Sequence, residues 1–269
     1  MKIHPTAVIS PTAELAADVE VGPRAVIGEG VRIGERSVIQ ANAVIDRDVI
    51  MGSDNVVGYG AVIGAPPQDF AHKADMRSYV RIGDRNRFRE YVTIHRGTKP
   101  ETETVVGNDC FLMVGCHLGH NVTLGNNIII TNNCLLAGYV DVGDFAVLGG
   151  GSVFHQFIRI GQRAMIAGGS SFNKDIPPFV TANFRNILVG INVIGLRRGG
   201  FSMETRMEIK RAFKLVYRSG LTVREGVAEA RKLTWGPEAH LFFDFIESSK
   251  RGTCTSNRLG DAQGSDEED

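Results

Sequence analysis

An aliphatic or aromatic side chain recurs at every sixth position over most of the chain between Ile3 and Phe172. The register begins at Ile3, Ile9, Leu15 and Val21, and it resumes after each of two interruptions. An amphipathic helix repeats every 3.6 residues and a half-buried strand alternates, so this period fits neither. It indicates short strands joined by tight corners, with three hexads making one coil of a parallel β-solenoid.

A second register of small or branched residues lies four positions after the first. It holds three of the four cysteines, Cys110, Cys116 and Cys134. Cys116 and Cys134 are separated by three hexads, so we expect them to stack on adjacent coils. Their spacing favours small core residues in a reducing compartment over a disulfide framework or a zinc ribbon.

Two polar segments interrupt the repeat, and we expect both to leave the solenoid as loops. Residues 65–79 open with Pro66-Pro67 and carry Gln68 and Asp69, and residues 97–104 are centred on Pro100. Loops that leave a regular solenoid are where function concentrates.

The repeat is expected to end at Pro177-Pro178, because proline cannot continue a strand ladder. We divide the chain into a solenoid over 1–180, a connector over 181–201, a helical domain over 202–250 and an acidic, disordered tail over 251–269. The helical domain should cover the open strand edges of the last coil.

Helix signals support that domain. Ser202 is a plausible N-cap for a helix that Gly220 ends. Thr222 and Glu225 have capping-box spacing for a second helix to about Leu233. Pro237 suits the first turn of a third.

Composition narrows the class of protein. The chain has no apolar run of about 18 residues and begins without a secretion signal, which predicts a cytoplasmic protein without a membrane span. Its net charge of +0 argues against a nucleic-acid partner. Basic residues crowd the stretch from Arg77 to Lys99, which is either a solvated face or a dock for an anionic partner.

Histidines concentrate in the most regular block of the repeat. His120 should lie near a corner, and steps of three hexads put Gly138 and then Gln156 beneath it. The predicted patch consists of His117, His120, Gly138, Tyr139, His155 and Gln156.

Such a patch supports two kinds of chemistry. A histidine can act as general base at neutral pH, and a glycine lets a substrate approach a backbone N–H that stabilises an oxyanion, which together describe acyl transfer. Alternatively, three histidines can hold zinc with an open position, as the solenoid anhydrases of the gamma class do between subunits.

Four stretches carry a specific resemblance: IGDRNRFREYVTIHRGT (82–98), HLGHNVTLGNN (117–127), VFHQFIRIGQRAMIAGGS (153–170) and NVIGLRRGGF (192–201). In order and spacing, over about residues 1–250, the chain resembles the acyl-carrier-protein-dependent UDP-N-acetylglucosamine 3-O-acyltransferases of lipid A biosynthesis. The resemblance implies a left-handed parallel β-helix with a small α-helical domain, and a homotrimer with active sites between subunits. It implies transfer of a 3-hydroxyacyl chain from acyl-carrier protein to the sugar 3-hydroxyl, without a cofactor or metal. The basic stretch then becomes a candidate dock for the acidic carrier.

The matching motifs imply a role for each of several residues. His120 resembles the general base and the Gly138 N–H the oxyanion donor. The remaining matches are to substrate-binding positions: His117, His155 and Gln156 near the sugar nucleotide and acyl chain, Gln68 and Asp69 in the inserted loop, Asn192 and Arg198 at the nucleotide, and Gly168 at the floor of the acyl groove.

The chain also departs from the family pattern. Asn121 stands where an aspartate is usual. Tyr139, which we also expect to contact the substrate, replaces a histidine. On the nucleotide side Ile194 and Gly199 replace a glutamate and an arginine. A loop lysine is missing, and His72 or Lys73 is the candidate substitute. A 3-amino sugar nucleotide or another acceptor sugar therefore remains an alternative.

Overall fold

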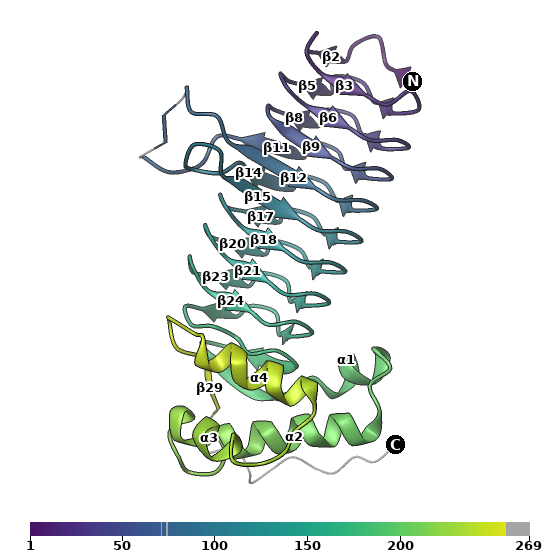
Figure 1. Ribbon diagram of the computed structural model, residues 1–269. Coiled ribbons are helices and arrows are strands. Elements are labelled where there is room, and N and C mark those ends of the chain that lie inside the picture. The colour runs from purple at the N-terminus through teal and green to yellow at the C-terminus, as the bar shows by residue number, and fades with distance from the viewer. Residues whose placement is uncertain (71, 74, 257–269) are drawn as a thin grey trace.

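Stacked coils form a long three-sided prism, and helices cover one end of it (Figure 1). The structure, a computed structural model, describes residues 1–70, 72, 73 and 75–256. Each coil contributes one short strand to each of three sheets, which we call faces A, B and C. The corners between them are the A–B, B–C and C–A edges.

Face A consists of β1 (Lys2–Ile3), β4 (Glu20–Val21), β7 (Val38–Ile39), β10 (Val56–Val57), β13 (Arg87–Phe88), β16 (Phe111–Leu112), β19 (Ile129–Ile130), β22 (Val147–Leu148), β25 (Met165–Ile166), β27 (Val180–Asn183), β28 (Ile187–Ile191) and β29 (Thr255–Ser256). Face B consists of β2 (Val8–Ile9), β5 (Val26–Ile27), β8 (Val44–Ile45), β11 (Val62–Ala65), β14 (Thr93–His95), β17 (His117–Leu118), β20 (Leu135–Leu136), β23 (Val153–Phe154) and β26 (Ser171–Phe172). Face C consists of β3 (Glu14–Leu15), β6 (Arg32–Ile33), β9 (Val49–Met51), β12 (Tyr79–Ile82), β15 (Glu103–Val106), β18 (Thr123–Leu124), β21 (Asp141–Val142) and β24 (Arg159–Ile160).

The hexad residues are the second residues of the two-residue strands, and they point into the prism. Leu118 pairs with Leu136, and Leu136 with Phe154, each three hexads further along the chain. All three are at most 3% exposed. The second register is also internal, because Cys110, Cys116 and Cys134 are buried free thiols, as predicted.

Both interruptions leave the prism at the B–C edge. The first lies between β11 and β12 and the second between β14 and β15. Each lengthens one coil beyond three hexads, so that Val56 pairs with Arg87 on face A, and Arg87 with Phe111. The ladder on each face stays parallel and paired across both insertions. Extra chain is therefore accommodated at one edge without disturbing the core.

The prediction that the ladder stops at Pro177-Pro178 was wrong. The prolines lie at a corner, where no ladder N–H is needed, and β27 then pairs in parallel with β25. β28 returns antiparallel to β27, inside the segment predicted as a connector.

The predicted tail also begins too early, because β29 pairs in parallel with β28. Thr253 and Cys254 are buried. The rest of the predicted tail, residues 257–269, lies outside the described residues.

Helices follow their capping signals. Asn192 caps α1 (Val193–Arg198), a short helix that the sequence analysis did not predict. Ser202 caps α2 (Met203–Tyr217), and Thr222 with Glu225 forms the predicted capping box of α3 (Val223–Ala230). α4 (Pro237–Glu247) begins with the expected proline. α2 and α3 end slightly before their predicted ends. No helix in the described ranges is long and apolar enough to cross a membrane.

A buried carboxylate joins the prism to the helices. The Asp175 side chain is 2% exposed and accepts hydrogen bonds from Arg159 Nε (3.2 Å) and Ser249 Oγ (2.8 Å). Arg159 in turn donates from Nη2 to the Phe245 carbonyl at the end of α4 (2.9 Å) and lies over the Phe245 ring. This junction ties the last coil to α4 and to the chain that follows it.

We expect Asp175→Asn to lower the free energy of unfolding by about 2 kcal/mol or more, because it leaves Arg159 without its charged partner. Asp54→Asn is the matched control: it breaks an ion pair with Arg36 whose side chains are 38% and 55% exposed, so we expect little change. Urea denaturation measures both. Equal midpoints for the two variants would show that the junction adds nothing to stability.

Candidate functional site

The B–C edge collects the predicted histidine patch. His117 lies on β17, and His120 follows in the corner before β18. The next coil places Gly138 and Tyr139 at the same corner, and the coil after that places His155 and Gln156 there, as the spacing of three hexads predicted. Backbone bonds fix this stacking, since Tyr139 N–H donates to the His120 carbonyl (3.0 Å).

The imidazole of His120 lies directly against Gly138. A Cβ at position 138 would lie 2.3 Å from His120 Cε1 and 2.5 Å from Nε2. Any other residue at 138 would therefore displace the ring. The Gly138 N–H donates no hydrogen bond within the described part of the chain. The corner thus offers an imidazole and a free backbone donor side by side.

Asn121 orients the ring from the other side. Its Oδ1 lies 3.2 Å from His120 Nδ1 and also accepts from the Thr98 N–H (3.0 Å). Because Oδ1 is the accepting end of the amide, Nδ1 of His120 is the protonated nitrogen and Nε2 is the unprotonated one. Asn121 has a φ of 59°, a left-handed conformation that asparagine tolerates well.

Aromatic rings support His120 laterally. Its ring meets Tyr139 edge-on at a centroid distance of 5.2 Å, and Tyr139 stacks on Phe157 at 4.8 Å with an interplanar angle of 14°. The three residues come from successive coils of the same corner. Tyr139, predicted as a substrate contact in place of the family histidine, therefore also packs against His120.

The sequence analysis missed His95. It ends β14, is 7% exposed, and its ring meets that of His117 edge-on at 4.9 Å. His117 Nδ1 lies 2.8 Å from Thr93 Oγ1. Stepping by three hexads skips His95, because the 97–104 insertion lengthens that coil, as the pairing of Thr93 with His117 records. The spacing across this insertion places Thr93 opposite His117, and His95 follows two residues later at the same corner.

Burial keeps two of these histidines neutral. It lowers the pKa of His95 to about 4, with further lowering from His117, His120 and Arg96. Burial, and then His120, also lowers the pKa of His117. His95 and His117 are therefore uncharged near neutral pH.

Both inserted loops are tied to this edge. Arg96 is buried, and its Nη1 donates to the Gly64 carbonyl (2.8 Å) at the root of the first loop. On β15, directly after the second loop, Thr104 Oγ1 donates to the His95 carbonyl (2.6 Å) and accepts from the Asn121 N–H (2.8 Å). In the first loop, Gln68 is exposed and Asp69 half-buried, on the same edge as His120.

Other predicted site residues lie on different edges. Gly168 lies in an A–B corner, where its nearest non-neighbouring atom is the Gly150 carbonyl oxygen, 3.1 Å from the position of a Cβ. Asn192 caps α1 with its side chain, and Arg198 ends that helix, near the C–A corner that holds Arg163. One copy of the chain therefore does not bring the whole predicted site together.

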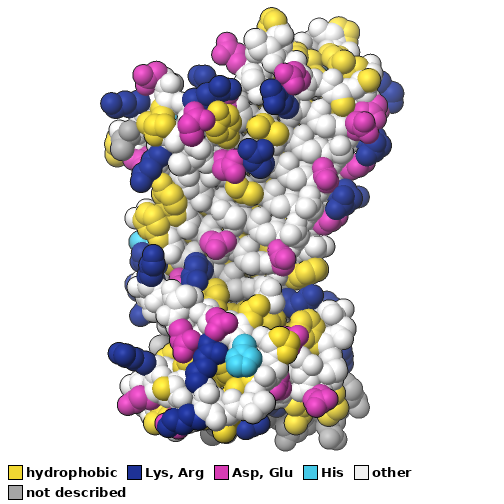
Figure 2. Space-filling model, in the orientation of Figure 1, with side chains coloured by type: hydrophobic (Ala, Val, Ile, Leu, Met, Phe, Trp, Pro, Cys, Tyr) yellow, Lys and Arg dark blue, Asp and Glu magenta, His cyan; other side chains and the backbone are white. Residues whose placement is uncertain are grey.

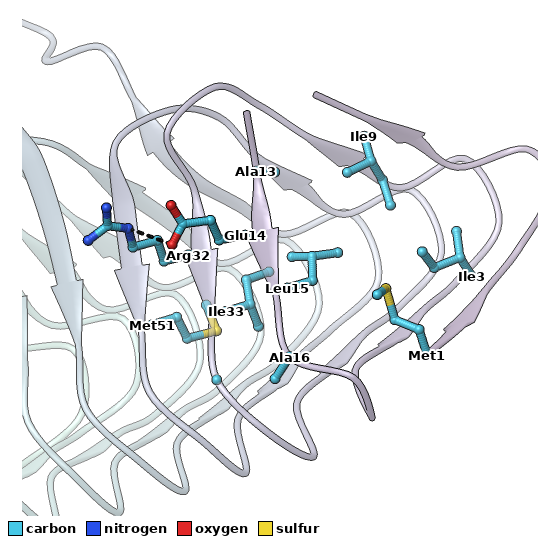
Figure 3. A pocket seen from close by; sticks show the side chains of 11 residues that line it. Met1, Ile3, Ile9, Ala13, Glu14, Leu15, Ala16, Arg32, Ile33 and Met51 are labelled. Atoms are coloured by element: carbon cyan, nitrogen blue, oxygen red, sulfur yellow. Dashed lines mark ion pairs between the residues drawn. The ribbon is translucent and has the colours of Figure 1, made fainter. Parts of the chain in front are cut away.

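One hollow lies away from the predicted site residues. About 860 Å³ opens at the N-terminal end of the prism, where Ile3, Ile9 and Leu15 line the uncovered core beside the Glu14–Arg32 ion pair (Figure 3). These three residues belong to the first coil. The hollow is the open end of the solenoid and holds none of the predicted site residues.

The prediction of one basic surface from Arg77 to Lys99 was wrong, because a coil of this length runs around the whole prism. Arg81 lies on face C, Arg87 on face A, and Arg96 is buried at the B–C edge. Most of these arginines are also paired, as Arg81 is with Glu103 and Arg85 with Asp109. Basic and acidic side chains are interspersed over the face shown in Figure 2.

The arrangement of residues in a single copy of the chain does not support the alternative of a zinc site. Within the described residues, no group of three His, Cys, Asp or Glu side chains is placed to hold a metal ion.

Comparisons with known proteins agree on one family. The family model described as "Udp N-acetylglucosamine O-acyltransferase; Domain 2" matches residues 175–254, and that for bacterial transferase hexapeptides matches residues 103–138. An acyl-[acyl-carrier-protein]–UDP-N-acetylglucosamine O-acyltransferase from Sulfurihydrogenibium sp. is 53% identical over 193 residues, 71% of each chain.

Solved structures show the same likeness. A UDP-N-acetylglucosamine acyltransferase from Bacteroides fragilis has a TM-score of 0.90 and 40% identity, covering 93% of this chain and 99% of that one. The enzyme from Francisella novicida has a TM-score of 0.89 and 33% identity, covering 98% and 100%. These neighbours and the hexapeptide match confirm the predicted left-handed parallel β-helix.

The low pKa of His95 predicts a pH-dependent stability. Its folded pKa of about 4 lies below the unfolded value near 6.5, so protonation favours the unfolded chain as pH falls from 6.5 toward 4. Between pH 7 and pH 5 the wild-type protein should lose up to about 2 kcal/mol more than His95→Gln, which cannot take up that proton. Urea denaturation at the two pH values checks this, and parallel losses in both proteins would contradict it.

Proposed function

Because this chain belongs to the UDP-N-acetylglucosamine O-acyltransferase family, we propose that it acylates the sugar 3-hydroxyl of UDP-N-acetylglucosamine from acyl-carrier protein, the first step of lipid A biosynthesis. The acyl group is a 3-hydroxyacyl chain carried as a thioester. The observation that carries the mechanism is the contact between the His120 ring and Gly138. A cytoplasmic location stays a prediction.

The reaction begins with His120. Its unprotonated Nε2 takes the proton of the sugar 3-hydroxyl as the oxygen attacks the thioester carbonyl carbon. The carbonyl oxygen becomes an oxyanion, which the Gly138 N–H stabilises. Collapse of the tetrahedral intermediate breaks the carbon–sulfur bond. His120 then returns its proton to the departing thiolate, leaving an ester on the sugar and the free thiol of the carrier.

Asn121 supports this role without a charge. The amide oxygen holds His120 in the tautomer that leaves Nε2 free. A carboxylate at this position would also stabilise the protonated imidazole, which a neutral amide does far less. We therefore propose that orientation, rather than charge, is what position 121 contributes in this chain.

The other residues of the B–C edge bind substrate. Gln68 and Asp69 lie in the inserted loop on the same edge as His120 and would hold the sugar and the acyl group. His117 and Tyr139 line the edge beside the reacting hydroxyl. His155 and Gln156 are exposed one coil below Gly138 and meet the substrate further along the edge.

The distribution of the remaining residues supports a homotrimer. Asn192 and Arg198 would bind the nucleotide from near the C–A edge, and Gly168 leaves room for the acyl chain at the A–B edge. Prisms packed around a threefold axis bring different edges of neighbouring copies together. Each active site would then combine the B–C edge of one copy with another edge of its neighbour.

The direct test is product formation. We expect the purified protein, given UDP-N-acetylglucosamine and 3-hydroxyacyl-carrier proteins of several chain lengths, to form an acylated UDP-sugar detectable by mass spectrometry. A 3-amino analogue of the sugar nucleotide tests the alternative acceptor in the same assay. Product with the amino sugar alone would move the proposal to an N-acyltransferase, and no product with any pair would contradict it.

Substitution of either corner residue should remove catalysis while the fold remains. His120→Ala deletes the base, and Gly138→Ala displaces the ring, because the new Cβ would overlap it. Each should lower kcat by roughly 100-fold or more. Gly190→Ala is the matched control, since a Cβ there meets nothing within 4 Å. Near-normal kcat in Gly138→Ala, with an unchanged circular dichroism spectrum, would exclude the proposed contact from the mechanism.

A further inference from the structure

Arginine occurs three times in one column of corner residues at the C–A edge. Arg36, Arg85 and Arg163 all adopt a left-handed backbone, with φ of 54°, 57° and 56°. Arg36 donates from Nε and Nη2 to the two carboxylate oxygens of Asp54, at 2.7 and 2.8 Å. Arg85 binds Asp109 in the same way, at 2.8 Å for both bonds. In both pairs the partner is the corner residue of the next coil.

Arg163 occupies the same corner but has aromatic neighbours instead. Its guanidinium carbon lies 4.1 Å from the centroid of the Phe145 ring, one coil earlier, and 5.0 Å from that of Phe201. Within the described residues the guanidinium makes no hydrogen bond or ion pair. Burial lowers its pKa, and the nearby Asp144 opposes that shift, yet a guanidinium stays charged at neutral pH. Aromatic rings that contact the faces of a guanidinium leave the N–H groups at its edge available to donate hydrogen bonds to a ligand.

Gly199 makes room for this guanidinium. Its φ of −78° and ψ of 4° are open to any residue, so the backbone does not require glycine. A Cβ there would lie 2.4 Å from Arg163 Nη1, closer than real contacts allow. A side chain at position 199 would therefore displace the Arg163 guanidinium from its present place.

The same corner holds the residues proposed to bind the nucleotide. The Asn192 side chain donates from Nδ2 to the Arg163 carbonyl (2.9 Å) and accepts from the Gly195 N–H through Oδ1 (2.9 Å). Arg198 precedes Gly199 at the end of α1 and is exposed. Arg163, Asn192 and the end of α1 thus form one connected unit.

We propose that Arg163 binds the diphosphate of the sugar nucleotide, as the cation that the family pattern would place at position 199. This inference rests on the proposed function, whose acceptor carries two linked phosphates. A guanidinium binds phosphate oxygens bidentately, and the two rings fix its orientation before the ligand arrives. The phosphate of the carrier's prosthetic arm is the other source of the same chemistry, and the experiment separates the two.

The test compares binding and kinetics in matched variants. Arg163→Met keeps an apolar stem between the rings and removes the charge. We expect its affinity for UDP, measured by calorimetry, to fall about 10-fold or more, while affinity for uridine stays the same. KM should rise for UDP-N-acetylglucosamine and stay unchanged for the acyl carrier. The control is Arg36→Met, the same change at a paired corner far from α1.

Two further variants keep the test decisive if Arg163→Met folds poorly. Arg163→Lys retains a cation without the fork and should lose less UDP affinity than Arg163→Met. Arg163→Ala combined with Gly199→Arg should recover UDP affinity. The double variant carries the guanidinium at position 199, which adjoins the place that the Arg163 guanidinium occupies in the wild-type protein.

The inference would be overturned if Arg163→Met, or Arg163→Lys where that variant alone folds, bound UDP as tightly as the wild-type protein does. An increase in KM for the acyl carrier alone would equally overturn it and assign Arg163 to the prosthetic arm. Failure of the proposed function has a different signature, namely a wild-type protein that forms no acylated sugar nucleotide.

Discussion

Register between coils is the constraint on which the rest of this structure depends. Strand pairing in the regular coils aligns residues separated by three hexads, so every third hexad returns to the same place on the same face. A slip of one residue would turn the inward row of aliphatic side chains outward and expose the core along an entire face. The two insertions respect this constraint, because both leave the prism at a corner and return to the pairing they left.

Fixed register turns the corners into columns of stacked residues, and the residues proposed for catalysis and binding lie in these columns. At the B–C edge, His120, Tyr139 and Phe157 follow one another on successive coils, with Gly138 making room for the imidazole. At the C–A edge the same geometry produces ion pairs, and near the helical end it produces an arginine held by aromatic rings. The side chain of a corner residue is not required for strand pairing. The residue type at a corner can therefore be one that supports binding or catalysis.

Sequence reasoning was most successful where this periodicity is unbroken. It identified the buried strand residues, the stacking of Gly138 beneath His120 and the caps of α2 and α3, because each depends on a short, fixed spacing. It missed His95, since an insertion changes the spacing on that coil. It assigned Arg77 to Lys99 to one surface, although a coil of that length passes through all three faces.

Non-local pairing could not be predicted from the sequence. β29 joins face A after the whole helical domain, and no local pattern marks Thr255–Ser256 as a partner of β28. Gly199 was visible as a departure from the family pattern, but only the structure relates it to Arg163.

Mixed assemblies test most directly whether one active site takes residues from two copies of the chain. His120→Ala and Arg198→Ala subunits, carrying different tags, would be co-expressed, and the doubly tagged assemblies isolated and assayed at limiting UDP-N-acetylglucosamine. Each variant alone should be nearly inactive. If each site of a trimer takes His120 from one copy and Arg198 from another, every mixed trimer regains one site with both wild-type residues, or about one third of the wild-type activity. Activity no higher than that of the separate variants, in assemblies shown to contain both tags, would contradict a site shared between copies.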